Sequence, residues 1–196
     1  QPAPAADNIN WLGRLPVVWH QRLRIAARLA LAAVLLLTVG SWFLKYFVLP
    51  IDYKQLASVQ PLPWPMVTPL GGEADTLVAQ ARQQYLEMKY QGASHTLAEA
   101  IGLNPTTATL KYIHGVSSYL ANDTDAAIVQ LEAALQLDSE LDDARWCLAH
   151  AYLKKHDREK AISHFAQLIE VKSPYESRSR DILKAIDPFY FLGRGF

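Results

Sequence analysis

The sequence contains almost no cysteine: among its 196 residues the only one is Cys147. A single cysteine excludes an intrachain disulfide and a four-cysteine zinc site. Net charge is lacking as well, because 19 lysines and arginines balance 19 aspartates and glutamates. There is also no basic stripe interleaved with aromatic residues, so the composition argues against nucleic acid as a partner.

Motifs for catalysis are also missing from the chain. It has no glycine-rich phosphate loop, no Cys-x-x-Cys-His haem site and no nucleophile elbow. Cys147 and His150 lie three residues apart and would share a helix face, but no third group orients the imidazole, which favours a buried thiol. The spacing of His150, His156 and His164 does not suit metal ligands on one helix face. We therefore expect no enzyme, no cofactor, no metal site and no small-molecule substrate.

One long apolar run is present near the N-terminus. No charged residue lies between Arg28 and Lys45, and apart from Lys45 the apolar character continues from Leu29 to Leu49. At about 1.5 Å per residue this run gives roughly 32 Å of helix, which matches a hydrocarbon core of about 30 Å. We predict a transmembrane helix over residues 25–49. The alternative is a signal peptide cleaved near Val39-Gly40-Ser41, but the apolar run continues past that point, which favours an uncleaved anchor.

Aromatic and basic residues flank the apolar run, as is typical of the membrane interface. They are Trp11, Trp19, Arg22, Arg24, Arg28, Trp42 and Lys45. Because more cations precede the run than follow it closely, the positive-inside rule predicts a cytoplasmic N-terminus. Residues 1–24 would then form a cytoplasmic and interfacial arm, and residues 50 onward would lie outside, in the periplasm of a bacterium.

Residues 50–72 contain five prolines and end in two glycines. Proline at this density disfavours both helix and sheet, so we predict an extended, semi-rigid linker. It either projects from the membrane or lies folded along the membrane or a partner. Trp64, between two prolines, is either a docking residue or a residue that packs against the first repeat, and the second interpretation is favoured.

The rest of the chain follows a regular interval. Ala93, Ala127 and Ala161 are evenly spaced, about 34 residues from one to the next. A bulky apolar residue follows each alanine four positions later, namely Leu97, Leu131 and Phe165. This self-similarity resembles the tetratricopeptide repeat, a helix-turn-helix unit with small residues where paired helices touch.

The resemblance covers residues 74–187 and is most specific in the third unit, ARWCLAHAYLKKHDREKAISHFAQLIEV. There Leu148, Ala149 and Tyr152 stand at the leucine, small-residue and tyrosine positions of the family. The second unit matches with Gly115, Ala127, Leu131 and Ala134. The family's first-helix tryptophan is replaced by Leu77, Lys111 and Arg145. The family's turn glycine is replaced by Met88, Asn122 and His156.

With the transmembrane helix predicted from the apolar run, the resemblance implies an all-α fold: a single N-terminal transmembrane helix, then a three-repeat α-solenoid and a C-terminal capping helix. The repeat domain covers residues 73–187, with units at about 74–107, 108–141 and 142–174 and a capping helix at 174–187.

Local signals mark the ends of several helices. Asp123 or Asp125, and Asp157, are predicted to cap the second helices of two units. Ser173-Pro174-Tyr175-Glu176 predicts a capping box with proline at the first helical position. Residues 188–196 form an aromatic tail that we expect to fold back onto the repeats, although it would also suit docking to a partner or membrane.

In this family, first-helix positions line a concave groove that binds peptides or partner helices. Carried over one by one, they are Val78, Arg82, Tyr85, Tyr112, Val116, Tyr119, Trp146, His150 and Lys154. Such an aromatic trough with cations at its ends suits an apolar segment that carries an acidic group or a free carboxylate. For Tyr112 and Trp146, packing between units is an equally good interpretation.

The layout resembles bacterial inner-membrane tetratricopeptide proteins, such as an ancillary subunit of the Sec translocon or cytochrome c maturation factors. This implies a non-enzymatic, membrane-anchored scaffold, an accessory or assembly subunit whose partners are other protein subunits and the lipid bilayer. The alternative is a transmembrane regulator of the anti-sigma-factor type with an extracytoplasmic repeat sensor. The stretches ARWCLAHAYLKK and SPYESRSRDILKAI resemble the tails of such regulators, but their Cys/His zinc module ahead of the anchor is missing here.

Overall fold

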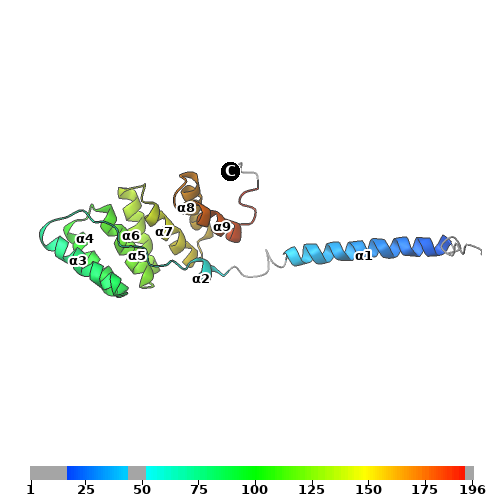
Figure 1. Cartoon of the computed structure of the whole chain (residues 1–196), viewed down its shortest axis with the longest axis horizontal. Helices are drawn as coiled ribbons and strands as arrows, with labels where there is room; N and C mark the ends of the chain where they lie inside the picture. Colours follow the sequence, from blue (N-terminus) through cyan, green and yellow to red (C-terminus); the bar gives the residue numbers. More distant parts are fainter. Residues whose placement is uncertain (1–16, 44–51, 193–196) are drawn as a thin grey trace, which may run out of the picture. The chain divides into compact units, whose positions relative to one another are not determined.

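The computed structural model describes residues 17–43 and 52–192, which fall into two units, residues 1–50 and 51–196 (Figure 1). The first unit holds helix α1, Val17–Phe43. The helices of the second unit are α2 (Tyr53–Leu56), α3 (Gly72–Leu86), α4 (Tyr90–Leu103), α5 (Ala108–Leu120), α6 (Thr124–Leu137), α7 (Asp142–Lys154), α8 (Arg158–Glu170) and α9 (Glu176–Ile186). The described residues contain helices and no strand, which confirms the predicted all-α class.

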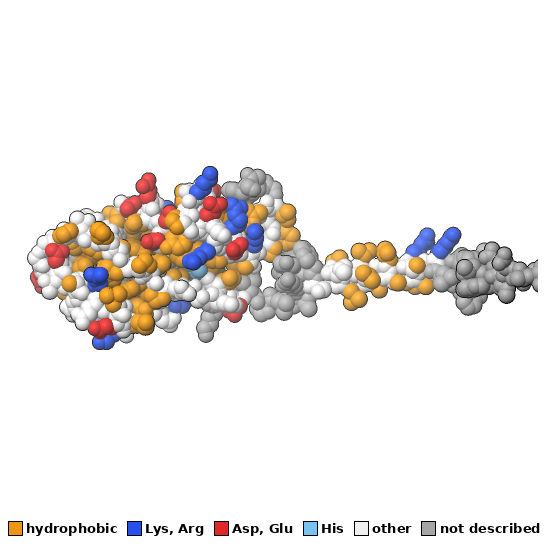
Figure 2. Space-filling view, in the orientation of Figure 1, with side chains coloured by type: hydrophobic (Ala, Val, Ile, Leu, Met, Phe, Trp, Pro, Cys, Tyr) orange, Lys and Arg blue, Asp and Glu red, His pale blue; other side chains and the backbone are white. Residues whose placement is uncertain are grey.

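Helix α1 has no sheltered face, because every side chain described on it, from residue 24 to residue 41, is exposed. Its window Arg24–Ser41 is long and apolar enough to cross a membrane, a property that a signal sequence shares. Figure 2 shows hydrophobic side chains along this helix and basic side chains toward its N-terminal end. The basic residues in the window are Arg24 and Arg28.

The remaining residues predicted at the membrane interface are not described in full. Trp11 and Lys45 lie outside the described residues. Trp19, Arg22 and Trp42 belong to α1, but their side chains are not described.

Three helix pairs, α3 with α4, α5 with α6 and α7 with α8, make up the repeat part of the second unit. The evenly spaced alanines, Ala93, Ala127 and Ala161, are completely buried in the second helix of each pair. The bulky residues four positions later are completely buried as well. The period therefore marks the surface that each second helix buries in the core.

Gly115 shows how closely one pair packs. A Cβ atom built on this residue of α5 would lie 2.6 Å from Cγ of Leu131 on α6. That separation is far below van der Waals contact, so the two helices approach this closely because residue 115 has no side chain.

The turn inside each pair keeps the conformation of the missing glycine. Met88, Asn122 and His156 have φ angles of 61°, 70° and 60°, in the left-handed region. In the first turn, the amide of Met88 donates to the carbonyl of Tyr85 at 3.0 Å and that of Lys89 to the carbonyl of Gln84 at 2.8 Å. These are the two bonds of a Schellman motif, which ends a helix with a residue in this conformation.

The predicted N-caps after these turns are confirmed for Asp123 and Asp157. The carboxylate of Asp123 accepts a hydrogen bond from the amide of Ala126 at 3.1 Å, and that of Asp157 accepts one from the amide of Lys160 at 3.2 Å. Asp125, the alternative cap, instead forms an ion pair with Lys155 at 2.8 Å.

The predicted capping box at the last helix is wrong, although the helix ends at Ile186 as predicted. Helix α9 begins at Glu176, two residues after Pro174, and has no side-chain cap. The reason is that the amide of Ser173 donates to the carbonyl of Leu168 at 3.0 Å and so completes the end of α8. The chain then makes one further turn before α9 starts.

The described part of the aromatic tail folds back, as expected. Tyr190 is buried in the core, and Phe191 is partly buried against it. The guanidinium of Arg180 lies 5.4 Å from the centroid of the Phe191 ring, a cation–π geometry. Phe189 remains exposed, and Phe196 lies outside the described residues.

Candidate functional site: a groove filled by the chain itself

The residues predicted to line the groove come from the first helix of each pair. Val78, Arg82 and Tyr85 lie on α3. Tyr112, Val116 and Tyr119 lie on α5. Trp146, His150 and Lys154 lie on α7. Several of them occupy equivalent positions of successive repeats, such as Tyr112 and Trp146, which are about 34 residues apart.

Most of these side chains are not open to solvent. Six of these residues each expose less than a tenth of their surface to solvent: Tyr85, Tyr112, Val116, Tyr119, Trp146 and His150. Arg82 is exposed, and Val78 and Lys154 are partly buried. An unoccupied trough would leave its aromatic floor accessible, so something else in the chain covers it.

The cover is the proline-rich segment that follows α2. We call residues 57–71 the strap; they have no regular secondary structure and connect α2, which contacts α7, to α3 (Figure 1). The strap therefore runs across the first helices from the third repeat to the first. It contains no charged residue and carries prolines at 61, 63, 65 and 69.

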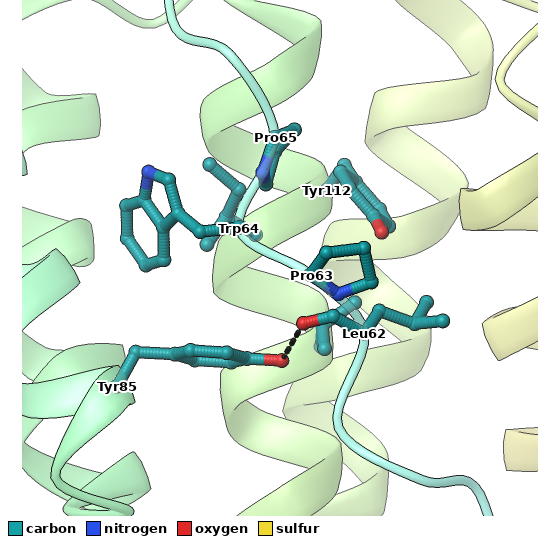
Figure 3. A pocket seen from close by; sticks show the side chains of 8 residues that line it. Leu62, Pro63, Trp64, Pro65, Tyr85 and Tyr112 are labelled. Atoms are coloured by element: carbon teal, nitrogen blue, oxygen red, sulfur yellow. Dashed lines mark hydrogen bonds between the residues drawn. The ribbon is translucent and has the colours of Figure 1, made fainter.

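Two tyrosines of the groove hold the strap by its backbone. The hydroxyl of Tyr119 donates a hydrogen bond to the carbonyl of Ala57, which is itself buried. The hydroxyl of Tyr85 donates to the carbonyl of Leu62 at 2.9 Å, as Figure 3 shows. Tyr85 and Tyr119 are one repeat apart, so the same helix position contacts the strap twice.

Between Tyr85 and Tyr112 the strap fills the groove, and we call this part the closed end. The ring centroids of Trp64 and Tyr85 are 5.5 Å apart with an edge-to-face angle of 67°. In Figure 3 the strap passes between Tyr85 and Tyr112, with Leu62 and Pro63 among them. The free space left here is about 10 Å³, which is no more than one water molecule needs.

At the third repeat the strap leaves a cavity of about 600 Å³, and we call this the open end. The cavity lies between residues 55–63 and the side chains of Trp146 and His150 on α7 and Arg178, Asp181 and Ile182 on α9. A volume of this size is within the range of ligand sites in proteins.

Trp146 is anchored by an aromatic cluster at the open end. It stacks on Tyr175 with centroids 4.6 Å apart and an interplanar angle of 12°. Its edge-to-face partners are His150, at 4.3 Å between centroids, and Phe165, at 5.6 Å. Trp146 thus packs in the core and also lines the cavity.

Burial sets the protonation of the groove. It raises the pKa of the Tyr85 and Tyr119 hydroxyls, which therefore remain hydrogen-bond donors at any physiological pH. It lowers the pKa of His150 to about 4, against a smaller opposing effect of the Leu56 backbone, so the imidazole is neutral at pH 7. Neither ring nitrogen of His150 has a well-formed hydrogen bond to any residue that the structure describes.

The two predicted cations lie toward opposite ends of the groove. The ammonium of Lys154 is 4.6 Å from the centroid of the Tyr119 ring, and burial lowers the pKa of this lysine. Arg82 lines a second cavity, of about 480 Å³, with strap residues 64–67. The repeat equivalent of Tyr85 and Tyr119 is Leu153 rather than Lys154, and Leu153 is fully buried.

The sequence interpretation missed the strap as the occupant of the groove. The residues that carry this contact, Ala57 and Leu62, have no distinguishing feature in the sequence, and the available signal was Trp64 between two prolines. Trp64 was expected against the first repeat, where it lies. Cys147 is completely buried, and burial raises the pKa of its thiol. Among the described residues no cluster of three metal-ligating side chains occurs.

Comparisons with known proteins agree with this fold. A family model described as tetratricopeptide repeat matches residues 119–177. The solved structures that match include the Yersinia enterocolitica type III secretion translocator chaperone SycD, at 18% identity and a TM-score of 0.51. The alignment covers 62% of this chain and 95% of that chain, and at this identity it shows a shared fold. No curated protein matches the chain significantly.

Proposed function

We propose that this tetratricopeptide repeat protein is a non-enzymatic, membrane-anchored scaffold that holds another protein chain in the groove of its repeat domain. It would serve as an accessory or assembly subunit of a bacterial membrane complex. The residues proposed to contact the partner are the groove positions named above, which include the cations Arg82 and Lys154.

The observation that carries the proposal is the groove itself. Its floor is built from repeat-spaced aromatic side chains, and at the open end about 600 Å³ remain unfilled beside Trp146 and His150. Buried aromatic anchors beside a free volume are typical of sites that receive a protein segment. The structurally similar SycD is named a translocator chaperone, which supports a protein rather than a small molecule as the partner.

The membrane anchor is supported by helix α1. Most of its described side chains are apolar and all are exposed, and water is a poor solvent for such a surface. We propose that α1 spans the inner membrane with the N-terminus in the cytoplasm and the repeats outside. Arg24 and Arg28 would then lie at the cytoplasmic interface, with Trp11, Trp19 and Arg22, and Trp42 and Lys45 at the opposite one.

Site-specific photo-crosslinking in native membranes tests the scaffold role. A photoreactive amino acid placed at Arg82 or Lys154 should crosslink the same partner protein, because both positions border the groove. The matched control is Val129, which is exposed on the second helix α6. An absence of crosslinks at both groove positions, or the same partner captured at Val129, would overturn the proposal.

Cysteine labelling tests the topology. In a Gln60→Cys variant, an impermeant maleimide added to intact cells should label residue 60, because it is exposed and proposed to lie outside. The unmodified chain is the control, since its Cys147 is completely buried. Labelling that requires permeabilised inner membranes would contradict the orientation. A mature mass that lacks residues 17–43 would identify α1 as a cleaved signal sequence.

A further inference from the structure

We propose that the strap is an internal ligand of the groove: a partner's extended, proline-containing apolar segment binds by displacing it. This inference rests on the proposed function and specifies how a partner enters the site. The strap thereby both closes the groove in the absence of a partner and indicates the chemistry of the segment that the groove accepts.

The hydrogen bonds between strap and groove involve only the backbone of the strap. Prolines at 61, 63 and 65 have no amide hydrogen, so this part of the strap offers mainly carbonyl acceptors. The groove supplies the matching donors, the hydroxyls of Tyr85 and Tyr119, which bond the carbonyls of Leu62 and Ala57. Backbone carbonyls are present in any extended chain, so these contacts do not require the strap's own sequence.

The side chains of the strap pack against the aromatic side chains of the closed end. Trp64 meets Tyr85 edge to face, and Leu62, Pro63 and Pro65 lie against Tyr112 and the neighbouring α5 side chains. Aromatic grooves bind proline-containing extended segments because such segments lose little conformational entropy on binding. A competing segment would therefore need an aromatic residue between prolines or residues of similar shape, and it would need no charge.

Much of the strap's own surface remains exposed, although its apolar side chains Val59, Leu62, Trp64, Val67 and Leu70 are partly buried against the core. Among residues 57–71 only Ala57 is buried, and Met66 is 97% exposed. Two tyrosine hydroxyls and one tryptophan ring supply the specific contacts between strap and groove that are described above. Strap residues 58–63 also line the cavity of the open end. An incoming chain therefore has space to bind there before the strap leaves the closed end.

Tethering makes the competition measurable. A segment joined to its own site by a short linker acts at an effective concentration in the millimolar range. If the free segment binds an empty groove at about 10–100 µM, the tether weakens an external ligand by roughly 10- to 100-fold. Weakening the internal ligand should release this inhibition.

The experiment uses the full chain in detergent micelles and a fluorescent synthetic peptide of residues 55–68, with binding followed by anisotropy. The Trp64→Ala variant should bind the peptide at least about tenfold more tightly than the unmodified protein. The matched control is Met66→Ala, on the same strap but exposed, which should bind the peptide as the unmodified protein does. A peptide in which the tryptophan is replaced by alanine should bind neither the unmodified protein nor the Trp64→Ala variant.

Equal affinities for Trp64→Ala and the unmodified chain, or no binding to either, would overturn the proposal. Circular dichroism checks that Trp64→Ala keeps its helices; if it unfolds, Trp64→Phe replaces it and should show a smaller gain of about threefold. If the unmodified chain forms dimers that the peptide converts to monomers, the strap binds a second copy and the internal-ligand proposal is wrong.

The outcome is separable from that of the proposed function. The peptide assay needs no cellular partner, whereas crosslinking at Arg82 and Lys154 does. A partner captured in the groove together with a peptide that never binds would preserve the scaffold role and reject displacement of the strap. Peptide binding without any captured partner would support displacement of the strap and reject the scaffold role.

Discussion

The closed and open ends of the groove are built from the same helix positions, yet they differ in how the strap meets them. At the closed end about 10 Å³ remain around Leu62 to Pro65, whereas at the open end about 600 Å³ remain beside Trp146 and His150. Tyr85 and Tyr119 donate to the strap, but their third equivalent, Leu153, has no hydroxyl and is buried. The repeat that has Leu153 in place of this tyrosine is therefore also the repeat at which the strap leaves the groove unfilled.

The largest effect is expected at the open end, from the buried imidazole of His150. Its pKa falls from 6.5 to about 4 on folding, so between these values the unfolded chain binds a proton that the folded chain does not. Stability should be level above pH 6.5 and should decrease as the pH falls from 6.5 to 4, by up to roughly 3 kcal/mol.

Urea unfolding of the unmodified chain and of His150→Leu at several pH values measures this contribution. Burial also lowers the pKa of His114 and His164, so the difference between the two proteins is the informative quantity. The variant should lose less stability in this range. An identical dependence on pH in both would show that His150 is accessible to protons in the folded state, and the cavity wall would then differ from the one described.

The next effect concerns the wall of the closed end. Gly115→Ala places a methyl group 2.6 Å from Leu131 Cγ, which should push α5, the helix that carries Tyr112 and Val116, away from α6. We expect a loss of about 2 kcal/mol in the free energy of unfolding. The matched control is Gly102→Ala in α4, where nothing lies within 4 Å and which should be neutral or slightly stabilising. Equal effects at the two glycines would contradict the close packing.

Contacts of the strap residue Trp64 should contribute to the stability of the closed end. Trp64→Ala removes a half-buried ring that contacts Tyr85, and we expect a loss of roughly 1.5 kcal/mol. Met66→Ala, two residues further along and 97% exposed, should change stability by less than about 0.5 kcal/mol. Urea unfolding of both variants checks the contrast, and a neutral Trp64→Ala would mean that the strap does not stabilise the groove.

The smallest effect is expected from the two hydroxyl donors. Tyr85→Phe and Tyr119→Phe should each cost about 1 kcal/mol and should speed cleavage of the strap by subtilisin. Tyr152→Phe is the control, because its hydroxyl donates to Glu132 on α6 rather than to the strap. It should destabilise the fold without changing cleavage of the strap. Faster cleavage in all three variants would assign the effect to general destabilisation.

The sequence predicted the elements that depend on local pattern. The period of Ala93, Ala127 and Ala161 marks the buried positions because close helix packing requires small residues at a fixed spacing. Met88, Asn122 and His156 were noted as substitutes for the turn glycine, and the turns are nevertheless formed. The free-energy cost of a left-handed φ at a residue with a side chain is small, and the two hydrogen bonds of the Schellman motif offset it.

The groove was predicted less completely, because its occupant comes from outside the repeats. Proline density predicts that residues 50–72 are extended but contains no information on the surface against which they lie. Ala57 meets Tyr119 from 62 residues away, a contact that no local periodicity encodes. The capping box failed for a related reason. The amide of Ser173 completes the end of α8, and its hydroxyl accepts a hydrogen bond from the amide of Tyr175 before α9 begins.

The central claim, that the strap occupies the groove of its own repeat domain, is tested most directly by nuclear Overhauser effects. In the full chain with labelled tryptophan and tyrosine, the 5.5 Å between the ring centroids of Trp64 and Tyr85 predicts cross-peaks between their ring protons. The cross-peaks should be absent from Tyr85→Leu. Their absence from the unmodified protein while its repeats remain folded would contradict the account.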